Sequence, residues 1–380
     1  MSIAKVSSLP AVWLQVKSNF SFTDLISFAP DNSSSDSTQS PRIRSLSTTP
    51  DHLLLLCSDR CLRILDAKSL LQVHSIPFES RPTSLTGVTL TNSPSTIWCG
   101  TSNNELIIYN STDFSLVKRI SSFSHSITSV FDSPTLGVFV ITANGHVRLY
   151  NRTEGTFLSD ISSFDDPVRI FTAFQNYFFI VINTSIVKFQ IDESFKVTRS
   201  IGEDLQIDEV PSVITILDNG YTPLLVVGTM NGLIRIYDVS TGDLLSKVKN
   251  HNHHVTAMIA SGSTLWSGDD RGNLVVWDFS NISDLSNPLC YKIGGHSGKV
   301  TSITCQESTT WISSSDGFIS CWNNPKGRKA FLKFSRKSDE HFDQIMSDSS
   351  KRQVLMTSIN LVLPWPYRHV ICLLIQHQSS

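Results

Sequence analysis

A motif that recurs seven times along the chain predicts an all-β fold, a seven-bladed β-propeller of four-stranded antiparallel blades. Each copy holds an apolar strand, a short polar turn and a second strand that ends in a large apolar or aromatic residue. Successive copies lie 39 to 48 residues apart, which suits a four-stranded blade. No helical period competes with this pattern over residues 42–335.

The large residue that ends the second strand sets the register of the copies. The two clearest copies, residues 226–238 and 266–278, end in an aromatic residue followed by Asp. The same position in all seven copies is occupied by Leu65-Asp66, Tyr109-Asn110, Tyr150-Asn151, Phe189-Gln190, Tyr237-Asp238, Trp277-Asp278 and Trp322-Asn323.

The turn inside each copy has the composition of a tight hairpin. Six of the seven residues that stand six positions before the anchors are Asn or Asp, and Gly follows directly in four copies: Asp59, Asn103, Asn144, Asn183, Asn231, Arg271 and Asp316. Tight hairpin turns need positive φ at central residues, which Gly, Asn and Asp tolerate best. Each copy is therefore predicted to contain a β-hairpin, with alternating strands such as 233–237 half-buried on a pleated surface.

The last copy resembles a WD repeat. Its Gly295-His296, Asp316-Gly317 and Trp322-Asn323 match the Gly-His to Trp-Asp frame of that family, and the sixth copy carries His251 and Trp277-Asp278 with Arg271 at the turn. The resemblance implies a hydrogen-bonded chain across the last blade, formed by His296, Ser314, Asp316 and Trp322. Copies one to five lack the Gly-His pair, so apolar packing alone is expected to hold them.

The sequence divides into three parts. Residues 1–41 form an N-terminal segment with a Ser-rich linker, residues 42–335 the propeller, and residues 336–380 an extension that is either an extra strand pair or a non-native end. Two segments are candidates for the outer strand of the last blade: residues 329–334, directly downstream of its anchor, and residues 12–16, an N-terminal clasp. Both alternatives stay open.

Composition points to a soluble intracellular protein. The fraction of hydrophobic residues, 40%, is ordinary for a soluble protein, and the net charge of −2 gives no basic excess for general nucleic-acid binding.

No membrane span is expected, because the apolar stretch 354–375 is interrupted by Pro364, Pro366 and Arg368. The N-terminus lacks the apolar run of a signal peptide, and the seven cysteines are scattered singly, as reduced thiols would be. A cytoplasmic location is expected.

Motifs for catalysis are weak. The loop 294–300 has the wrong spacing for a phosphate-binding loop, and no nucleophile elbow occurs. The run 251–254 has three His residues but no Cys or carboxylate at ligand spacing, so it is interpreted as a structural loop. No catalytic, cofactor-binding or metal-binding residue is therefore predicted, and the protein is not expected to be an enzyme.

The loops offer a surface for partners instead. In a propeller, the loops between blades and the turns of the central hairpins share one face. Acidic loops into blades four and five would lie opposite basic ones of blades six and seven. The candidate rim comprises Asp165, Asp166, Glu203, Asp204, Asp208, Glu209, His251, Arg271 and Lys299. The predicted function is a scaffold that binds proteins or peptides through this rim and the central funnel.

An alternative comes from a second resemblance. Residues 264–269 and 310–312 are similar to segments of propellers attached to Rho-type guanine nucleotide exchange factors and inositol polyphosphate 5-phosphatases. This similarity implies the regulatory propeller of a larger signalling enzyme, with its catalytic domain absent from this chain.

Overall fold

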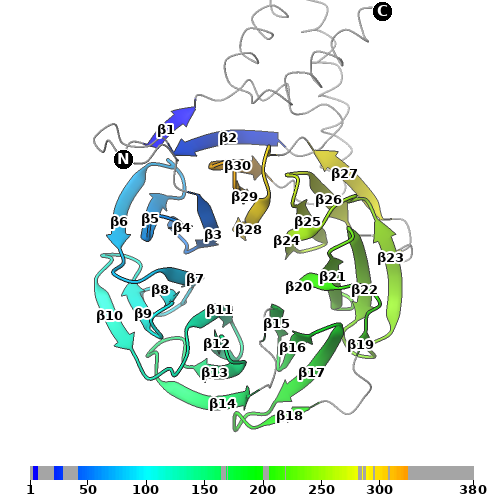
Figure 1. Cartoon of the computed structure of the whole chain (residues 1–380), viewed down its shortest axis with the longest axis horizontal. Coiled ribbons are helices and arrows are strands. Elements are labelled where there is room, and N and C mark those ends of the chain that lie inside the picture. Colours follow the sequence, from blue (N-terminus) through cyan, green and yellow to red (C-terminus); the bar gives the residue numbers. More distant parts are fainter. Residues whose placement is uncertain are drawn as a thin grey trace, which may run out of the picture.

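Seven sheets surround a central channel in the computed structural model of the protein (Figure 1). The structure describes residues 3–6, 21–28, 42–163, 168, 170–199, 205–218, 220–280, 285, 288–293, 296–306 and 309–323. Every regular element among these residues is a β-strand, and neighbouring strands pair antiparallel. The predicted seven-bladed β-propeller is confirmed.

In blades 1 to 6 the strands follow one another outward from the channel in chain order, and in blade 7 the strands β28, β29 and β30 do so (Figure 1). Blades 1 to 3 contain β3 (Ile43–Thr48), β4 (His52–Cys57), β5 (Cys61–Asp66), β6 (Gln72–Pro77), β7 (Pro82–Val88), β8 (Thr96–Thr101), β9 (Leu106–Asn110), β10 (Leu116–Ile120), β11 (Ile127–Ser133), β12 (Gly137–Thr142), β13 (His146–Tyr150) and β14 (Phe157–Ser163). Blade 4 contains β15 (Ile170–Phe174), β16 (Tyr177–Ile182) and β17 (Ser185–Ile191), with β18 (Val197–Arg199) and β19 (Leu205–Gln206) both paired to β17.

Blades 5 to 7 follow the same plan. They contain β20 (Pro211–Leu217), β21 (Leu224–Thr229), β22 (Leu233–Asp238), β23 (Leu244–Lys249), β24 (Val255–Ser261), β25 (Thr264–Asp269), β26 (Leu274–Asp278), β27 (Leu289–Ile293), β28 (Val300–Gln306), β29 (Thr309–Ser314) and β30 (Phe318–Asn323).

An N-terminal strand closes the ring. The outer strand of blade 7 is β2 (Ser21–Phe28), which pairs antiparallel with β30 and carries β1 (Ile3–Val6) on its other edge (Figure 1). The two segments considered from the sequence, residues 12–16 and 329–334, lie outside the described residues. Because β2 and β30 come from opposite ends of the propeller sequence, their pairing ties the first blade to the last.

The direction of the strands defines two faces. The first and third strands of a blade start at the same end, so the loops between blades and the turns between second and third strands lie together. We call this side the loop face and the other side, with the remaining turns, the opposite face. One residue in each second-to-third turn has positive φ. In six turns it is Gly or Asn, as the pattern predicts: Asn104, Gly145, Asn183, Gly232, Gly272 and Gly317. In blade 1 it is Arg60 instead.

The core lies between the blades. Seven hydrophobic clusters each fill the space between two neighbouring sheets. Between blades 6 and 7, for example, the rings of Trp266 and Trp322 pack with centroids 6.2 Å apart. Strands β8, β12 and β21 are buried at every residue, because both of their sheet faces are covered. No helix in the described part of the chain is long and apolar enough to cross a membrane.

Candidate interaction face

A buried hydrogen-bonded chain fixes the loop that enters blade 6. The His251 Nδ1 atom lies 3.2 Å from a carboxylate oxygen of Asp269 and its Nε2 atom 2.7 Å from the Ser267 hydroxyl. The Trp277 indole donates to the same hydroxyl oxygen at 2.8 Å. His251 is 1% exposed. Its predicted place on the binding rim is therefore wrong, because the side chain serves the interior and is shielded from a partner.

The carboxyl group of Asp269 stays ionised among these hydrogen-bonded side chains. Burial alone would raise its pKa, but hydrogen bonds from His251, from the Asn273 side chain and from the backbone N–H groups of Asn273 and Arg271 lower it from the ordinary 3.8 to about 2. The carboxylate thus joins the loop into blade 6 to the turn between β25 and β26.

This shift predicts a pH dependence of stability. Because the pKa of Asp269 is lower in the folded than in the unfolded chain, ionised Asp269 stabilises the fold above about pH 4, and this stabilisation is lost as the pH falls toward about 2. The difference in unfolding free energy between wild type and Asp269→Asn is expected to be constant above about pH 5 and to shrink below about pH 4. Urea titrations at successive pH values measure it; a difference that stays the same at every pH would contradict the assignment.

Blade 7 contains a similar chain with one different member. His296 Nδ1 lies 3.3 Å from Asp316, and His296 Nε2 lies 2.9 Å from the hydroxyl of Ser320, to which the Trp322 indole donates at 2.9 Å. Three of the four predicted residues are thus connected. The fourth, Ser314, is not: its hydroxyl donates to the carbonyl of Gly298 at 2.9 Å.

The strand register explains the wrong choice of Ser314. In blade 6 the linking Ser267 stands ten residues before the Trp, on β25. Blade 7 has the apolar Ile312 at that position, so no hydroxyl is available on β29. Ser320, two residues before the Trp on β30, supplies it instead.

Buried arginines form ion pairs in two blades that lack the loop His. Arg63 in blade 1 donates to Asp59 at 3.0 Å, and Arg235 in blade 5 pairs with Asp208 at 2.9 Å and with Glu209. Both arginines are almost fully buried and stand two residues before the anchor, at the position of Ser320 in blade 7. The expectation that apolar packing alone holds blades 1 to 5 is therefore wrong for these two.

Removing the blade 5 pair is expected to destabilise the protein. Arg235→Leu leaves Glu209, whose side chain is 22% exposed, without its cation, and a loss of about 2–4 kcal/mol in unfolding free energy is expected. Arg148→Leu is the matched control, because Arg148 stands at the same position of blade 3 but pairs with the solvated Asp160; its loss should be about 1 kcal/mol or less. Urea unfolding of both variants measures the difference, and equal losses would contradict a special role for Arg235.

The predicted rim is only partly placed by the structure. Asp208, Arg271 and Lys299 are exposed on the loop face, while Glu209 is partly covered. Both Asp208 and Glu209 already pair with Arg235, which reduces the negative charge that they present. The other acidic candidates lie outside the described residues: Asp165, Asp166, Glu203 and Asp204.

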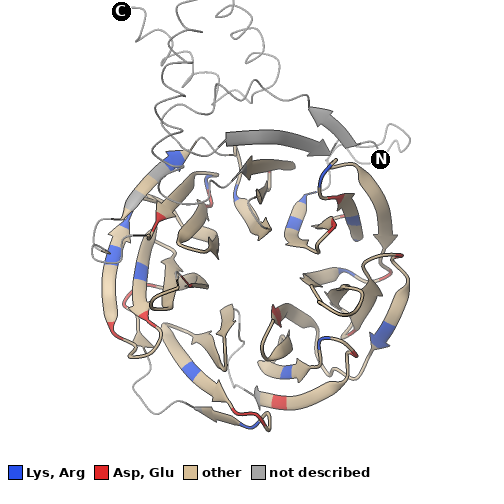
Figure 2. Ribbon diagram, turned by 180° about the vertical axis from the view of Figure 1, so that it is seen from behind, with Lys and Arg blue, Asp and Glu red and all other residues tan. Residues whose placement is uncertain are grey.

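A basic cluster that the sequence reasoning missed lies on blades 1 and 2. Arg42, Arg44, Arg60 and Arg81 are all exposed and stand in, or directly beside, loops and turns of the loop face. Lys and Arg positions (blue) and Asp and Glu positions (red) both occur around the ring (Figure 2). The available signal was the presence of five arginines between residues 42 and 81.

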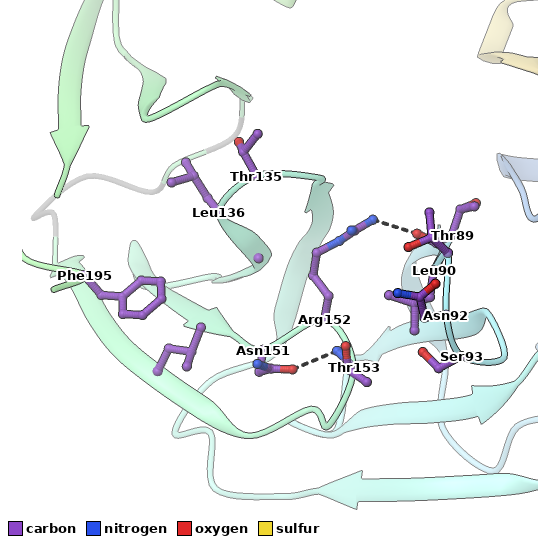
Figure 3. A pocket seen from close by; sticks show the side chains of 13 residues that line it. Thr89, Leu90, Asn92, Ser93, Thr135, Leu136, Asn151, Arg152, Thr153 and Phe195 are labelled. Atoms are coloured by element: carbon purple, nitrogen blue, oxygen red, sulfur yellow. Dashed lines mark hydrogen bonds between the residues drawn. The ribbon is translucent and has the colours of Figure 1, made fainter. Parts of the chain in front are cut away.

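A pocket of about 560 Å³ lies on the opposite face, lined by turns of blades 2, 3 and 4 (Figure 3). Arg152 lies inside it, but its guanidinium binds both carboxylate oxygens of Asp132, at 2.7 and 2.8 Å, and the carbonyl of Thr89 at 2.9 Å. The cation therefore joins blades 2 and 3. Among the residues that the structure describes, no group of three or more His, Cys, Asp or Glu side chains is arranged to hold a metal.

Comparisons with known proteins agree with this geometry. Residues 287–323 match the family model described as "WD domain, G-beta repeat". No curated protein matches the sequence. Among solved structures, the crystal structure of the computationally designed Ika8 protein aligns with a TM-score of 0.57 at 15% identity, over 85% of this chain and 96% of that one. At this identity the likeness concerns the fold alone.

Proposed function

Because the chain is a WD-repeat β-propeller, we propose that it is a non-catalytic scaffold in the cytoplasm whose loop face binds protein or peptide partners. WD-repeat propellers generally serve protein interaction. The observation that carries the proposal for this chain is the way its loops are held. Buried polar chains anchor them in blades 1, 5, 6 and 7, beside exposed Arg and Lys side chains.

Rigid loops favour binding for an energetic reason. A surface that is ordered before its partner arrives loses little conformational entropy on association. The His251–Asp269 and His296–Asp316 pairs each join a loop between blades to a neighbouring turn, so the exposed Arg271 and Lys299 stand on an ordered backbone. The loop face thus combines fixed geometry with free charges, as a recognition surface requires.

The regulatory-propeller alternative stays a prediction from sequence similarity. Residues 264–269 and 310–312 form or belong to β25 and β29, which are the second strands of their blades and are largely buried. Packing in the core determines which residues occur there, so the similarity of these segments is evidence about the fold and not about an attached catalytic domain.

Affinity purification of the tagged chain from its own cells tests the scaffold role. The wild type is compared with Arg271→Glu/Lys299→Glu on the loop face and with Lys68→Glu/Lys196→Glu, which makes the same charge change at exposed turn residues of the opposite face. Partners identified by mass spectrometry should be depleted with the first variant and retained with the second. Equal retention by both variants, or no partner with any of them, would contradict the proposal.

A further inference from the structure

The first strand of six blades has a recurrent irregularity at its loop-face end, where one residue leaves the regular pairing with the second strand. In six first strands the pairing skips the second residue, which makes it a β-bulge: Arg44, Thr83, Thr128, Ser212, Thr256 and Thr301. A bulge removes a residue from the regular ladder and re-aims its side chain. Five of these residues are Ser or Thr, and Arg44 is the exception.

The hydroxyl residues use this position to link blades. Ser212 donates to the carbonyl of Val255 at 2.6 Å, and Thr256 donates to the carbonyl of Val300 at 2.6 Å, each on the first strand of the next blade. Thr83 makes the same contact with Ile127. Arg44 brings a long cation to the corresponding site at the junction of blades 1 and 2, where Arg81 directly precedes β7.

The two arginines stand at the loop-face ends of neighbouring inner strands, since Arg44 lies on β3 and Arg81 directly precedes β7, and a hydrogen bond from the Gly87 N–H to the Ser47 hydroxyl joins these strands. Partial burial and the charge of Arg81 lower the pKa of Arg44. Within the described part of the chain, neither arginine forms an ion pair, whereas the nearby Asp59 is bound to Arg63. Two neighbouring guanidinium groups with free donors repel each other, and an anion that bridges them relieves this repulsion.

Two more arginines extend the positive surface. Arg42 is exposed just before β3, and Arg60 is exposed in the turn between β4 and β5, with its guanidinium 3.3 Å from the Glu79 carbonyl. The Glu79 side chain is exposed in the same loop and forms no ion pair among the described residues. The four arginines outnumber the acidic side chains of these loops and give this part of the loop face a positive excess.

We propose that Arg44 and Arg81, flanked by Arg42 and Arg60, form a recognition site for an acidic peptide segment of a partner protein. Arginine binds carboxylates through paired N–H donors, which favours Asp and Glu side chains. A nucleic acid fits less well, because its affinity depends on many phosphate contacts, and this patch is local on a chain of net charge −2. This inference rests on the proposed scaffold function and assigns a partner chemistry to the loop face.

Fluorescence anisotropy with defined probes tests the site on the full chain. The probe is a fluorescein-labelled peptide of six alternating Asp and Glu residues flanked by Gly, and its Asn/Gln counterpart is the neutral control. Wild type is compared with Arg44→Glu/Arg81→Glu and with the opposite-face control Lys68→Glu/Lys196→Glu. All four positions are exposed, so both variants are expected to keep the wild-type melting temperature.

The acidic peptide should bind wild type and the control variant within about twofold of each other, and at least about tenfold more weakly to Arg44→Glu/Arg81→Glu. Binding should weaken as salt rises. Equal binding by the arginine variant, equal binding of the neutral peptide, or tighter binding of an oligo-dT of the same charge would overturn the proposal. If the peptide fails to bind while partners still depend on Arg271 and Lys299 in cells, this inference fails and the scaffold function stands.

Discussion

Gly272→Ala is expected to lower the free energy of unfolding by about 3–5 kcal/mol. Gly272 has a φ of +85° in the turn between β25 and β26, and a Cβ atom there would lie 2.0 Å from the carbonyl oxygen of His296. Such a contact is impossible without a shift of the backbone in blade 6 or in the loop into blade 7. The substitution therefore strains the backbone at Gly272 and also forces the turn of blade 6 away from the loop that enters blade 7.

Gly317→Ala is the matched control for that prediction. Gly317 occupies the same turn position of blade 7 with a φ of +87°, but no atom of the described residues lies within 4 Å of its added Cβ. Only the strain of positive φ remains, and the loss should be about 1–2 kcal/mol. Urea unfolding followed by tryptophan fluorescence measures both variants. Equal losses would mean that the close approach between turn and loop contributes nothing.

His251→Leu is expected to produce a loss of similar size, about 3–5 kcal/mol. The leucine removes the hydrogen-bonding partner of Asp269, whose carboxylate is fully buried, and of the Ser267 hydroxyl. A buried charge that loses a partner is more costly than the pair was favourable. Thermal unfolding monitored by circular dichroism and urea unfolding both report the change.

His253→Leu separates this effect from any general sensitivity of the loop. His253 lies two residues further along the same loop and is exposed, so its substitution should change the unfolding free energy by no more than about 0.5 kcal/mol. If the two variants are equally stable, the His251–Asp269 pair does not anchor the loop into blade 6.

Much of the architecture was predictable because it is encoded locally. The anchors and the Asn-Gly or Asp-Gly turns recur with the blade period, and the positive φ at Gly145, Gly232, Gly272 and Gly317 is a property of each short segment. The N-terminal strand β2 that closes the ring was harder to predict. Its partner β30 lies almost 300 residues away from β2, and no local pattern reports a pairing of that kind.

The site was harder to predict, because its contacts cross strands and blades. Ser314 and Ser320 are equally plausible in sequence, and the apolar Ile312 on the neighbouring strand decides between them. Likewise, Arg235 and the exposed Arg44 have the same chemistry, but acids from an adjoining loop neutralise Arg235, whereas none of the described residues forms an ion pair with Arg44. Charge counted along the chain does not distinguish a cation that is bound internally from one that is free.

The most direct test of a binding loop face is hydrogen exchange of the purified chain, alone and saturated with a partner recovered from cells. The scaffold account predicts slower exchange in loop-face turns such as 58–60, 102–105 and 270–273, with no change in opposite-face turns such as 111–115 and 240–243. Protection confined to the opposite face or to the outer strands would contradict it.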